Sequence, residues 1–86
     1  MEKKFSKEEI RTVLIEMVSA KFGVDHKDIT PESNFTTNLG ADSLDLVEMI
    51  MSVEKTFGIA VPDSDAQRFK TVGDVIDYLD KKLNAQ

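Results

Sequence analysis

Ser43 stands between two acids, Asp42 and Asp45, in the stretch LGADSLDLVEM of residues 39–49. A serine at the start of an amphipathic segment most often caps a helix, because its hydroxyl accepts a hydrogen bond from a free backbone N–H. Here Asp42 is itself a preferred cap, and Asp45 follows it at the spacing of a capping box. We therefore predict that the Ser43 hydroxyl is free on the first helical turn, where the positive helix end favours an attached phosphate.

Catalysis by a serine nucleophile requires a neighbouring general base and a third group that orients this base. The only histidine, His26, lies seventeen residues before Ser43 in a polar loop. A small serine hydrolase is therefore the weakest function considered, and we expect His26 to be an exposed loop residue. The chain is predicted to have no enzymatic activity of its own.

Metal sites find little support in the sequence, which contains no cysteine. The stretch DSDAQRFKTVGD of residues 63–74 begins like a calcium-binding loop. However, Arg68 occupies the position of the required glycine, and Asp74 occupies the position of the usual bidentate glutamate. The glycines stand singly, so no phosphate-cradling loop is expected. We predict no metal ligands.

Hydrophobic spacing and capping signals predict the two helices nearest to Ser43 in the chain. Ser6 and Glu9 form a capping box, and Gly23 is placed to end the helix that follows. The apolar face of this first helix is Ile10, Val13, Leu14, Met17 and Val18. A second helix is expected over residues 42–57, closed by Gly58. Its inner stripe is predicted as Leu46, Val47, Ile50, Val53 and Phe57, with Leu44 and Met51 flanking.

The connection between these helices, residues 24–41, shows no sustained hydrophobic period and contains Pro31 and Gly40. A connection this long in a small domain usually indicates a functional loop, a loop packed against the core, or a wrong assignment of the helices. Its apolar residues are Val24, Ile29, Phe35 and Leu39. We therefore expect the loop to fold down over the core, with Gly40 allowing a bend just before the second helix.

The C-terminal third of the chain predicts two more helices. Residues 58–62 must be a loop because Pro62 cannot continue a helix, and a short third helix is expected over Asp63–Phe69. Thr71 and Asp74 repeat the capping pattern at the start of the last helix. Its inner face is predicted as Val72, Val75, Ile76, Leu79 and Leu83. Since no segment alternates like a strand, we predict an all-α, small four-helix bundle with a long first loop and a short third helix, formed by residues 1–86 as a single domain.

The charge is concentrated in the middle of the chain. The net charge is −5, and residues 31–65 carry seven acids and one lysine, a net charge of −6. Nucleic acid is excluded as a partner because its phosphates would be repelled, whereas a basic protein surface is complementary. The alternative is a solvated acidic face that only aids solubility.

The bulk composition also bears on location. No run of apolar residues exceeds three, so neither a signal peptide nor a membrane span is expected. The absence of cysteine agrees with a reducing compartment. We expect a cytoplasmic monomer without stable membrane insertion.

Several segments of the chain together resemble one known family, the acyl carrier proteins. They are the loop residue Phe35, the attachment motif GADSLD of residues 40–45, the following acidic helix, IAVPD of residues 59–63, and KTVGDVIDYL of residues 70–79. The resemblance implies a four-helix bundle in which Ser43 receives 4′-phosphopantetheine from coenzyme A. The thiol of this arm would carry acyl groups as thioesters, which would supply the sulfur chemistry that a chain without cysteine lacks.

The resemblance also implies partners and site residues. The partners would be a phosphopantetheinyl transferase (holo-carrier synthase) and the ketoacyl synthases, reductases, dehydratases and acyltransferases of fatty-acid or related acyl-chain synthesis, which dock through basic patches. The expected partner-binding residues are Asp42, Leu44, Asp45, Val47, Glu48, Met51, Glu54, Val61 and Asp63. Core packing is an equally good interpretation of Val47 and Met51. The expected lining of an acyl pocket is Phe35, Leu46, Ile50, Val53 and Ile76.

Some positions depart from the family pattern and keep alternatives open. Asn38 stands where an acid usually precedes LG, Lys55 and Thr56 replace part of a glutamate cluster, and Gln67 replaces a common acid. These changes thin the negative face and leave room for a specialised polyketide, peptidyl or D-alanyl carrier. A different class of function is an unmodified acidic helical adaptor that docks on a basic partner.

Overall fold

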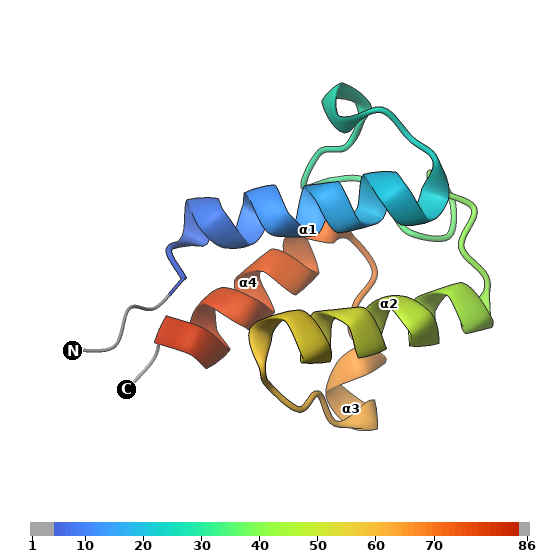
Figure 1. The fold of residues 1–86 in the computed structure, drawn as a ribbon. Coiled ribbons are helices and arrows are strands. Elements are labelled where there is room, and N and C mark those ends of the chain that lie inside the picture. The colour runs from blue at the N-terminus through green and yellow to red at the C-terminus, as the bar shows by residue number, and fades with distance from the viewer. Residues whose placement is uncertain (1–4, 85–86) are drawn as a thin grey trace.

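The computed structural model describes residues 5–84, and every regular element in this range is helical (Figure 1). The elements are α1 (Lys7–Phe22), the short 3₁₀ turn η1 (His26–Asp28), α2 (Ser43–Phe57), α3 (Asp63–Ala66) and α4 (Val72–Asn84). The described residues contain no strand, only an isolated antiparallel bridge between Asn34 and Thr71. The predicted all-α bundle with a long first loop and a short third helix is confirmed.

Both ends of α1 form as its sequence predicts. The Ser6 hydroxyl accepts a hydrogen bond from the Glu9 N–H at 3.1 Å, and the Glu9 carboxylate accepts one from the Ser6 N–H at 2.9 Å. Gly23 ends the helix in the left-handed conformation. Ile10, Leu14 and Val18 lie four residues apart and are completely buried. This row is the α1 side of the core.

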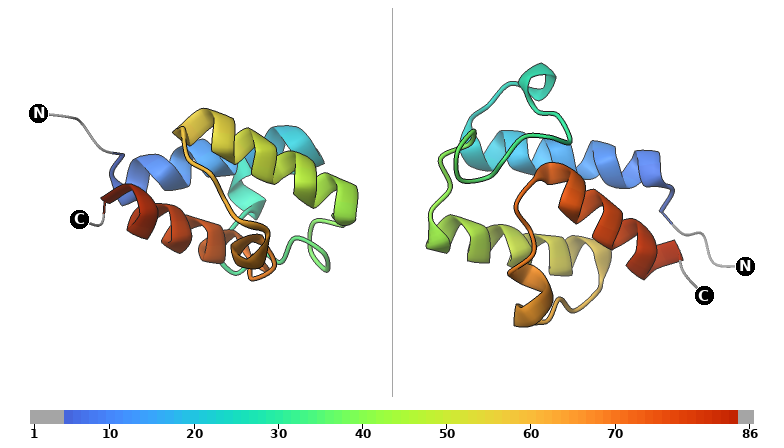
Figure 2. Two further views of the ribbon diagram at one scale, coloured as in Figure 1. Left: turned by 90° about the horizontal axis from the view of Figure 1, so that it is seen from below. Right: turned by 180° about the vertical axis from the view of Figure 1, so that it is seen from behind.

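The core lies where α1 packs against α2 and α4. Figures 1 and 2 show α4 running obliquely across one side of the α1–α2 pair, with the long first loop at one edge of the molecule and α3 at the other. The buried hydrophobic residues are Ile10, Leu14, Val18, Ile29, Phe35, Ala41, Met49, Val53, Phe57, Val61, Phe69, Val72, Val75, Ile76 and Leu79. Each helix longer than one turn contributes residues at helical spacing, which is the pattern expected of a packed bundle.

The inner face of α2 differs from the prediction by a rotation about the helix axis. Met49, Val53 and Phe57 are buried, while Val47 is exposed. Two residues along an α-helix are roughly 200° apart, so Val47 points away when Met49 points inward. Leu46 and Ile50 are partly buried against the core. Placing Val47 in the inner stripe was therefore wrong, and Met49 was missed.

The loop between α1 and α2 packs against the bundle as expected. Ile29 and Phe35 are buried in the core, and Val24 and Leu39 are partly buried against it. The Phe35 N–H donates to the Lys70 carbonyl oxygen at 3.0 Å, which ties this loop to the segment just before α4. The sequence did not predict η1, because a three-residue turn has no hydrophobic period.

The third helix is shorter than predicted, since it ends at Ala66 and not at Phe69. After Ala66 the chain continues in turns, and Phe69 is buried in the core. The Phe69 ring packs edge-to-face on Tyr78 of α4, with centroids 5.1 Å apart. The last helix begins with the predicted capping pair, because the Asp74 N–H donates to Thr71 Oγ1 at 3.2 Å and the Thr71 N–H donates to Asp74 Oδ2 at 3.0 Å.

Gly73 is required by a close approach between α4 and the first loop. Its N–H donates to the Pro31 carbonyl oxygen at 2.8 Å. A Cβ atom at position 73 would lie 2.9 Å from that oxygen and 3.3 Å from Pro31 Cβ. The contact joins backbone to backbone, so a side chain there can be accommodated only if the loop moves.

We predict that Gly73→Ala lowers the free energy of unfolding by about 1–3 kcal/mol, as overpacking does. Helix propensity alone would predict the opposite, because it favours alanine over glycine by about 1 kcal/mol. Urea unfolding followed by circular dichroism measures the change. Ser52→Ala at an exposed position of α2 is the control, and it should leave stability unchanged or slightly higher. A Gly73→Ala variant more stable than the parent would contradict the prediction.

A hydrogen bond joins α3 to α4. The Tyr78 Oη donates to Asp65 Oδ2 at 2.7 Å. Burial of the phenol, together with its hydrogen bond to the negatively charged Asp65, raises the pKa of Tyr78 to about 12. Both effects oppose ionisation, because a phenolate at this position would lose its solvation and face a carboxylate.

The raised pKa of Tyr78 predicts how the stability of the protein changes at high pH. A folded pKa above the unfolded value of 10.0 means that the stability contributed by neutral Tyr78 is complete below pH 10.0 and is lost as the pH rises through about 12. Tyr78 is the only tyrosine, so the ultraviolet absorbance of tyrosinate reports this group alone. Asp65→Asn should lower the midpoint without removing the effect of burial. A midpoint at the ordinary value in the folded protein would disprove the coupling.

Candidate attachment and docking site

Ser43 is the first residue of α2, and Asp42 is the N-cap. Asp42 Oδ1 accepts a hydrogen bond from the Asp45 N–H at 2.9 Å, and Asp45 Oδ2 accepts one from the Asp42 N–H at 3.2 Å. The two acids therefore cap the helix reciprocally, as predicted. Ser43 is exposed, and within residues 5–84 its hydroxyl makes no hydrogen bond. The side chain is free to act as an acceptor of a covalent group.

The chain approaches Ser43 through a bend that the loop holds in place. Gly40 has a φ of 71° and open space around the position of a Cβ atom. Next to it, Ala41 is buried and its N–H donates to the Phe35 carbonyl oxygen at 2.8 Å. The left-handed conformation of Gly40 therefore lies just before Ala41, which anchors the chain in the core two residues before the exposed Ser43. Phe35 supports the site through this backbone hydrogen bond.

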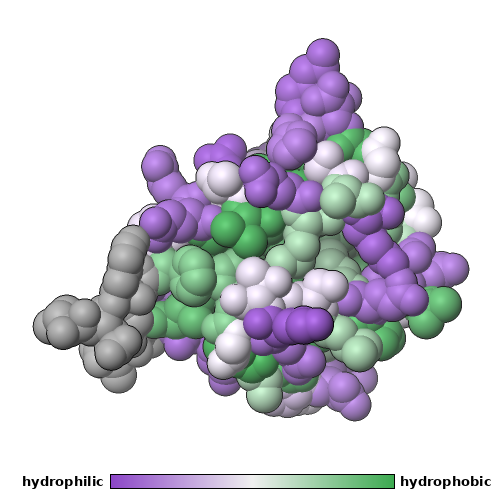
Figure 3. All heavy atoms as spheres, viewed as in Figure 1, coloured by the Kyte–Doolittle hydropathy of each residue, from purple (hydrophilic) through white to green (hydrophobic). Residues whose placement is uncertain are grey.

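One face of α2 beside Ser43 is apolar and exposed. The exposed fractions of Leu44, Val47 and Met51 are 63%, 52% and 60%. These residues are three and four positions apart, so they form one row along the helix. Their exposure removes core packing as an interpretation of Val47 and Met51. Figure 3 shows hydrophobic and hydrophilic side chains intermingled over the end of the molecule where α2 begins.

Charged groups border this row. We define the docking face as the row Leu44, Val47 and Met51 together with the acids Asp42, Asp45 and Glu48. Asp42 and Glu48 are exposed, and Asp45 is half-buried. Apolar side chains bordered by acids form a surface that is complementary to a protein surface with both apolar and basic groups.

The other expected partner-binding residues lie elsewhere. Val61 is buried, with 7% of its surface exposed, so it belongs to the core and not to an accessible face. Glu54 is half-buried, and its Oε2 accepts a hydrogen bond from the Val61 N–H at 2.8 Å. This carboxylate holds the loop after α2. Asp63 is exposed at the start of α3.

A cation that is remote in the sequence, Lys21, reaches the docking face. Lys21, in the last turn of α1, forms an ion pair with Glu48, and its Nζ lies 3.9 Å from Asp45 Oδ1. The hydrogen bond that the Lys21 ammonium donates to Glu48, together with the neighbouring acids, raises the pKa of Lys21. Lys21 and Glu48 are 27 positions apart. No local spacing signals such a pair, which becomes visible only once α1 packs beside α2.

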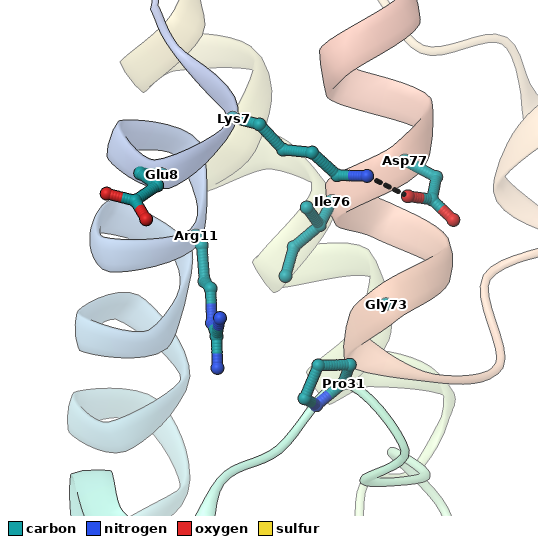
Figure 4. A pocket seen from close by; sticks show the side chains of 7 residues that line it. All are labelled: Lys7, Glu8, Arg11, Pro31, Gly73, Ile76 and Asp77. Carbon is teal, nitrogen blue, oxygen red and sulfur yellow. Dashed lines mark ion pairs between the residues drawn. The ribbon is translucent and has the colours of Figure 1, made fainter.

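The expected acyl-pocket residues occupy three kinds of position. Phe35 and Val53 are almost completely buried, while Leu46 and Ile50 are partly buried at the core margin. Ile76 lines a cavity of about 270 Å³ between α1, the first loop and α4 (Figure 4). The other lining residues of this cavity are Lys7, Glu8, Arg11, Pro31, Gly73 and Asp77.

Features that would indicate hydrolysis are not assembled around Ser43. His26 is exposed in η1, and its Nδ1 lies 3.5 Å from the Ser19 hydroxyl oxygen. A nucleophilic serine needs a base within hydrogen-bond reach, and none bonds to Ser43 among residues 5–84. Separately, no helix in the described range is long and apolar enough to cross a bilayer.

Comparison with known proteins identifies the family to which the chain belongs. Residues 12–79 match a family model described as "Phosphopantetheine attachment site", and this match includes α2 and the docking face. Acyl carrier proteins with similar sequences share nearly half of their residues with the chain. The chain belongs to the acyl carrier protein family.

The similarity to individual acyl carrier proteins is extensive. The acyl carrier protein of Porphyromonas gingivalis is 47% identical over 75 residues, which are 87% of this chain and 96% of the relative. That of Thermotoga maritima is 45% identical over 78 residues, which cover 91% of this chain and 96% of the relative. A solved structure of the acyl carrier protein from Enterococcus faecalis, described for its high thermal stability, superposes with a TM-score of 0.78 at 29% identity. It covers 88% of this chain and 96% of that one.

Membership of the acyl carrier protein family establishes the general function. The chain is a non-catalytic carrier of acyl groups, and its family uses a phosphopantetheine prosthetic group. Acyl carrier proteins serve the enzymes of fatty-acid synthesis. The prediction of a carrier and not an enzyme is confirmed.

The capping geometry gives Asp42 and Ser43 different roles, because only Asp42 caps the helix. We predict that Asp42→Ala lowers the free energy of unfolding by about 1 kcal/mol, because the helix loses its N-cap. Ser43→Ala should change it by less than about 0.5 kcal/mol, since the hydroxyl caps nothing. Thermal and urea unfolding provide the measurement.

Asp42→Ser is the matched control, because serine caps a helix as well as aspartate does but carries no charge. It should keep most of the stability that Asp42→Ala loses. If Ser43→Ala proves as harmful as Asp42→Ala, the serine is a structural cap and this division of duties is wrong.

Proposed function

We propose that Ser43 carries the 4′-phosphopantetheine arm and that residues 1–86 form a single carrier domain. The observation that supports this most strongly is the free, exposed hydroxyl of Ser43 on the first turn of α2. The residues present fit the group, because a phosphodiester at Ser43 would lie beside the positive end of α2. Asp42 and Asp45 already satisfy each other's N–H groups, so the hydroxyl can be consumed without loss of the cap.

The attachment step balances with coenzyme A as the donor. A bond forms between Ser43 Oγ and the phosphorus next to the pantetheine, the pyrophosphate bond of coenzyme A breaks, and adenosine 3′,5′-bisphosphate leaves. The serine proton passes to a base of the transferase. The attached arm supplies a thiol that holds acyl groups as thioesters, in a chain that has no cysteine of its own.

The docking face would receive the enzymes that load and use this arm. We propose basic patches on a phosphopantetheinyl transferase, ketoacyl synthases, reductases, dehydratases and acyltransferases as its partners. The acids would speed encounter with such patches, while Leu44, Val47 and Met51 would contact the partner directly. Asp63 and Glu54 would add charge at the far end of α2. Contacts of this kind give rapid, salt-sensitive association.

The carried acyl chain would enter the bundle from the margin of α2. Leu46 and Ile50 are partly buried between the exposed row and the core, and Phe35, Val53 and Ile76 lie deeper. We propose that these five residues line the acyl site when a chain is bound. Burying each CH₂ group there would contribute about 0.8 kcal/mol. The cytoplasm is the proposed location, in agreement with the absence of cysteine.

Incubation with coenzyme A and a bacterial phosphopantetheinyl transferase tests the attachment. Intact-mass analysis should show a gain of one 4′-phosphopantetheine in the native protein and no gain in Ser43→Ala. Ser52→Ala is the control, because it removes another exposed serine of α2 and should still be modified. A native protein that gains no mass, or a gain that survives Ser43→Ala, would rule out Ser43 as the attachment point.

A further inference from the structure

Lys21 places a positive charge of the same chain next to the acids of the docking face. The C-terminal end of α1 and the N-terminal end of α2 lie at the same end of the molecule (Figure 1). From α1, Lys21 reaches across to pair with Glu48 and approach Asp45. Within residues 5–84, no other lysine or arginine forms an ion pair with the acids of the docking face.

We propose that Lys21 competes with the basic groups of docking partners for the carboxylates of the docking face. It occupies Glu48 and Asp45, two of the three acids that border the exposed apolar row. A partner cation that binds these carboxylates must displace the Lys21 ammonium. The proposal rests on the proposed function, because it concerns the partners that dock beside Ser43.

The ion pair between Lys21 and Glu48 is weak enough for a partner to displace it. The Lys21 and Glu48 side chains are 30% and 49% exposed, so water screens their attraction. Exposed pairs of this kind contribute little to stability and exchange readily. The neighbouring acids raise the pKa of Lys21, so its ammonium stays charged in the neutral range as that of an ordinary lysine does.

The ion pair divides the docking face into two parts. Asp42 and the apolar row stay uncovered, whereas Glu48 and Asp45 are partly neutralised. An arginine of a partner can form two parallel hydrogen bonds to a carboxylate, which a lysine cannot. Partners that bring an arginine to Glu48 should therefore displace Lys21 more readily than partners that bring a lysine.

Transferase kinetics with variants of Lys21 tests the proposal. We expect Lys21→Met to raise kcat/KM for phosphopantetheine transfer about two- to fivefold, mainly through a lower KM for the carrier. The gain should shrink as salt is added, because both competing attractions are screened. Lys21→Arg keeps the charge and should show no gain.

Lys7→Met is the matched control. Lys7 also lies on α1 and pairs with an exposed acid, Asp77, at 3.1 Å, but at the opposite end of the helix (Figure 4). Its loss changes the net charge equally, so any gain from global charge appears in both variants. A gain in kcat/KM that is equal for Lys7→Met and Lys21→Met would overturn the proposal.

A purely structural role for Lys21 makes different predictions. If the pair only fastens α1 to α2, Lys21→Met lowers the melting temperature and leaves KM unchanged or higher, which overturns the proposal. In a Glu48→Gln background, competition predicts that Lys21→Met gives a smaller gain than in the native background. If neither the native protein nor Lys21→Met acquires phosphopantetheine, the proposed function fails, whereas equal kcat/KM values for the two proteins reject only the proposal that Lys21 competes.

Discussion

Two reciprocal hydrogen bonds at the start of α2 hold the arrangement on which the rest of the site depends. Asp42 and Asp45 each accept the N–H of the other, so the helix begins at Ser43 without using its hydroxyl. If serine were the cap, the same oxygen would be needed for the helix and for attachment. Because Asp42 and Asp45 cap the helix, this conflict does not arise, and two carboxylates lie beside the proposed attachment point. In the proposed function, helix stability and the attraction of partners therefore depend on the same two side chains.

α2 serves both the core and the surface because its two faces differ sharply. Met49, Val53 and Phe57 are buried, while Leu44, Val47 and Met51 stand in water. Large exposed apolar side chains next to one another usually mark a contact surface. At the far end, Glu54 turns back to the Val61 N–H and fixes the loop to α3. Thus the acids of α2 have different duties along its length, the first capping the helix and the last holding a loop.

Features local in the sequence could be predicted, and those that depend on packing could not. The caps at Ser6, Asp42 and Thr71 were readable because each joins residues three positions apart. The rotation of α2 was not, since both Val47 and Met49 are apolar and only the neighbouring helices decide which is buried. α3 stops early because Phe69 must reach the core beside Tyr78. Attachment at Ser43 was suggested by its neighbours, but the contact of Lys21 with Glu48 required the fold.

The position of Lys21 follows from the way the two helix ends meet. The C-terminus of α1 carries partial negative charge and favours a lysine, while the N-terminus of α2 carries partial positive charge and favours acids. When these ends pack side by side, a cation and a group of acids are brought together by preferences that each helix satisfies alone. The resulting pair weakens the field of the docking face without removing it. A carrier must leave each enzyme as readily as it arrives, so an acidic face of moderate strength suits repeated transfer better than one of maximal strength.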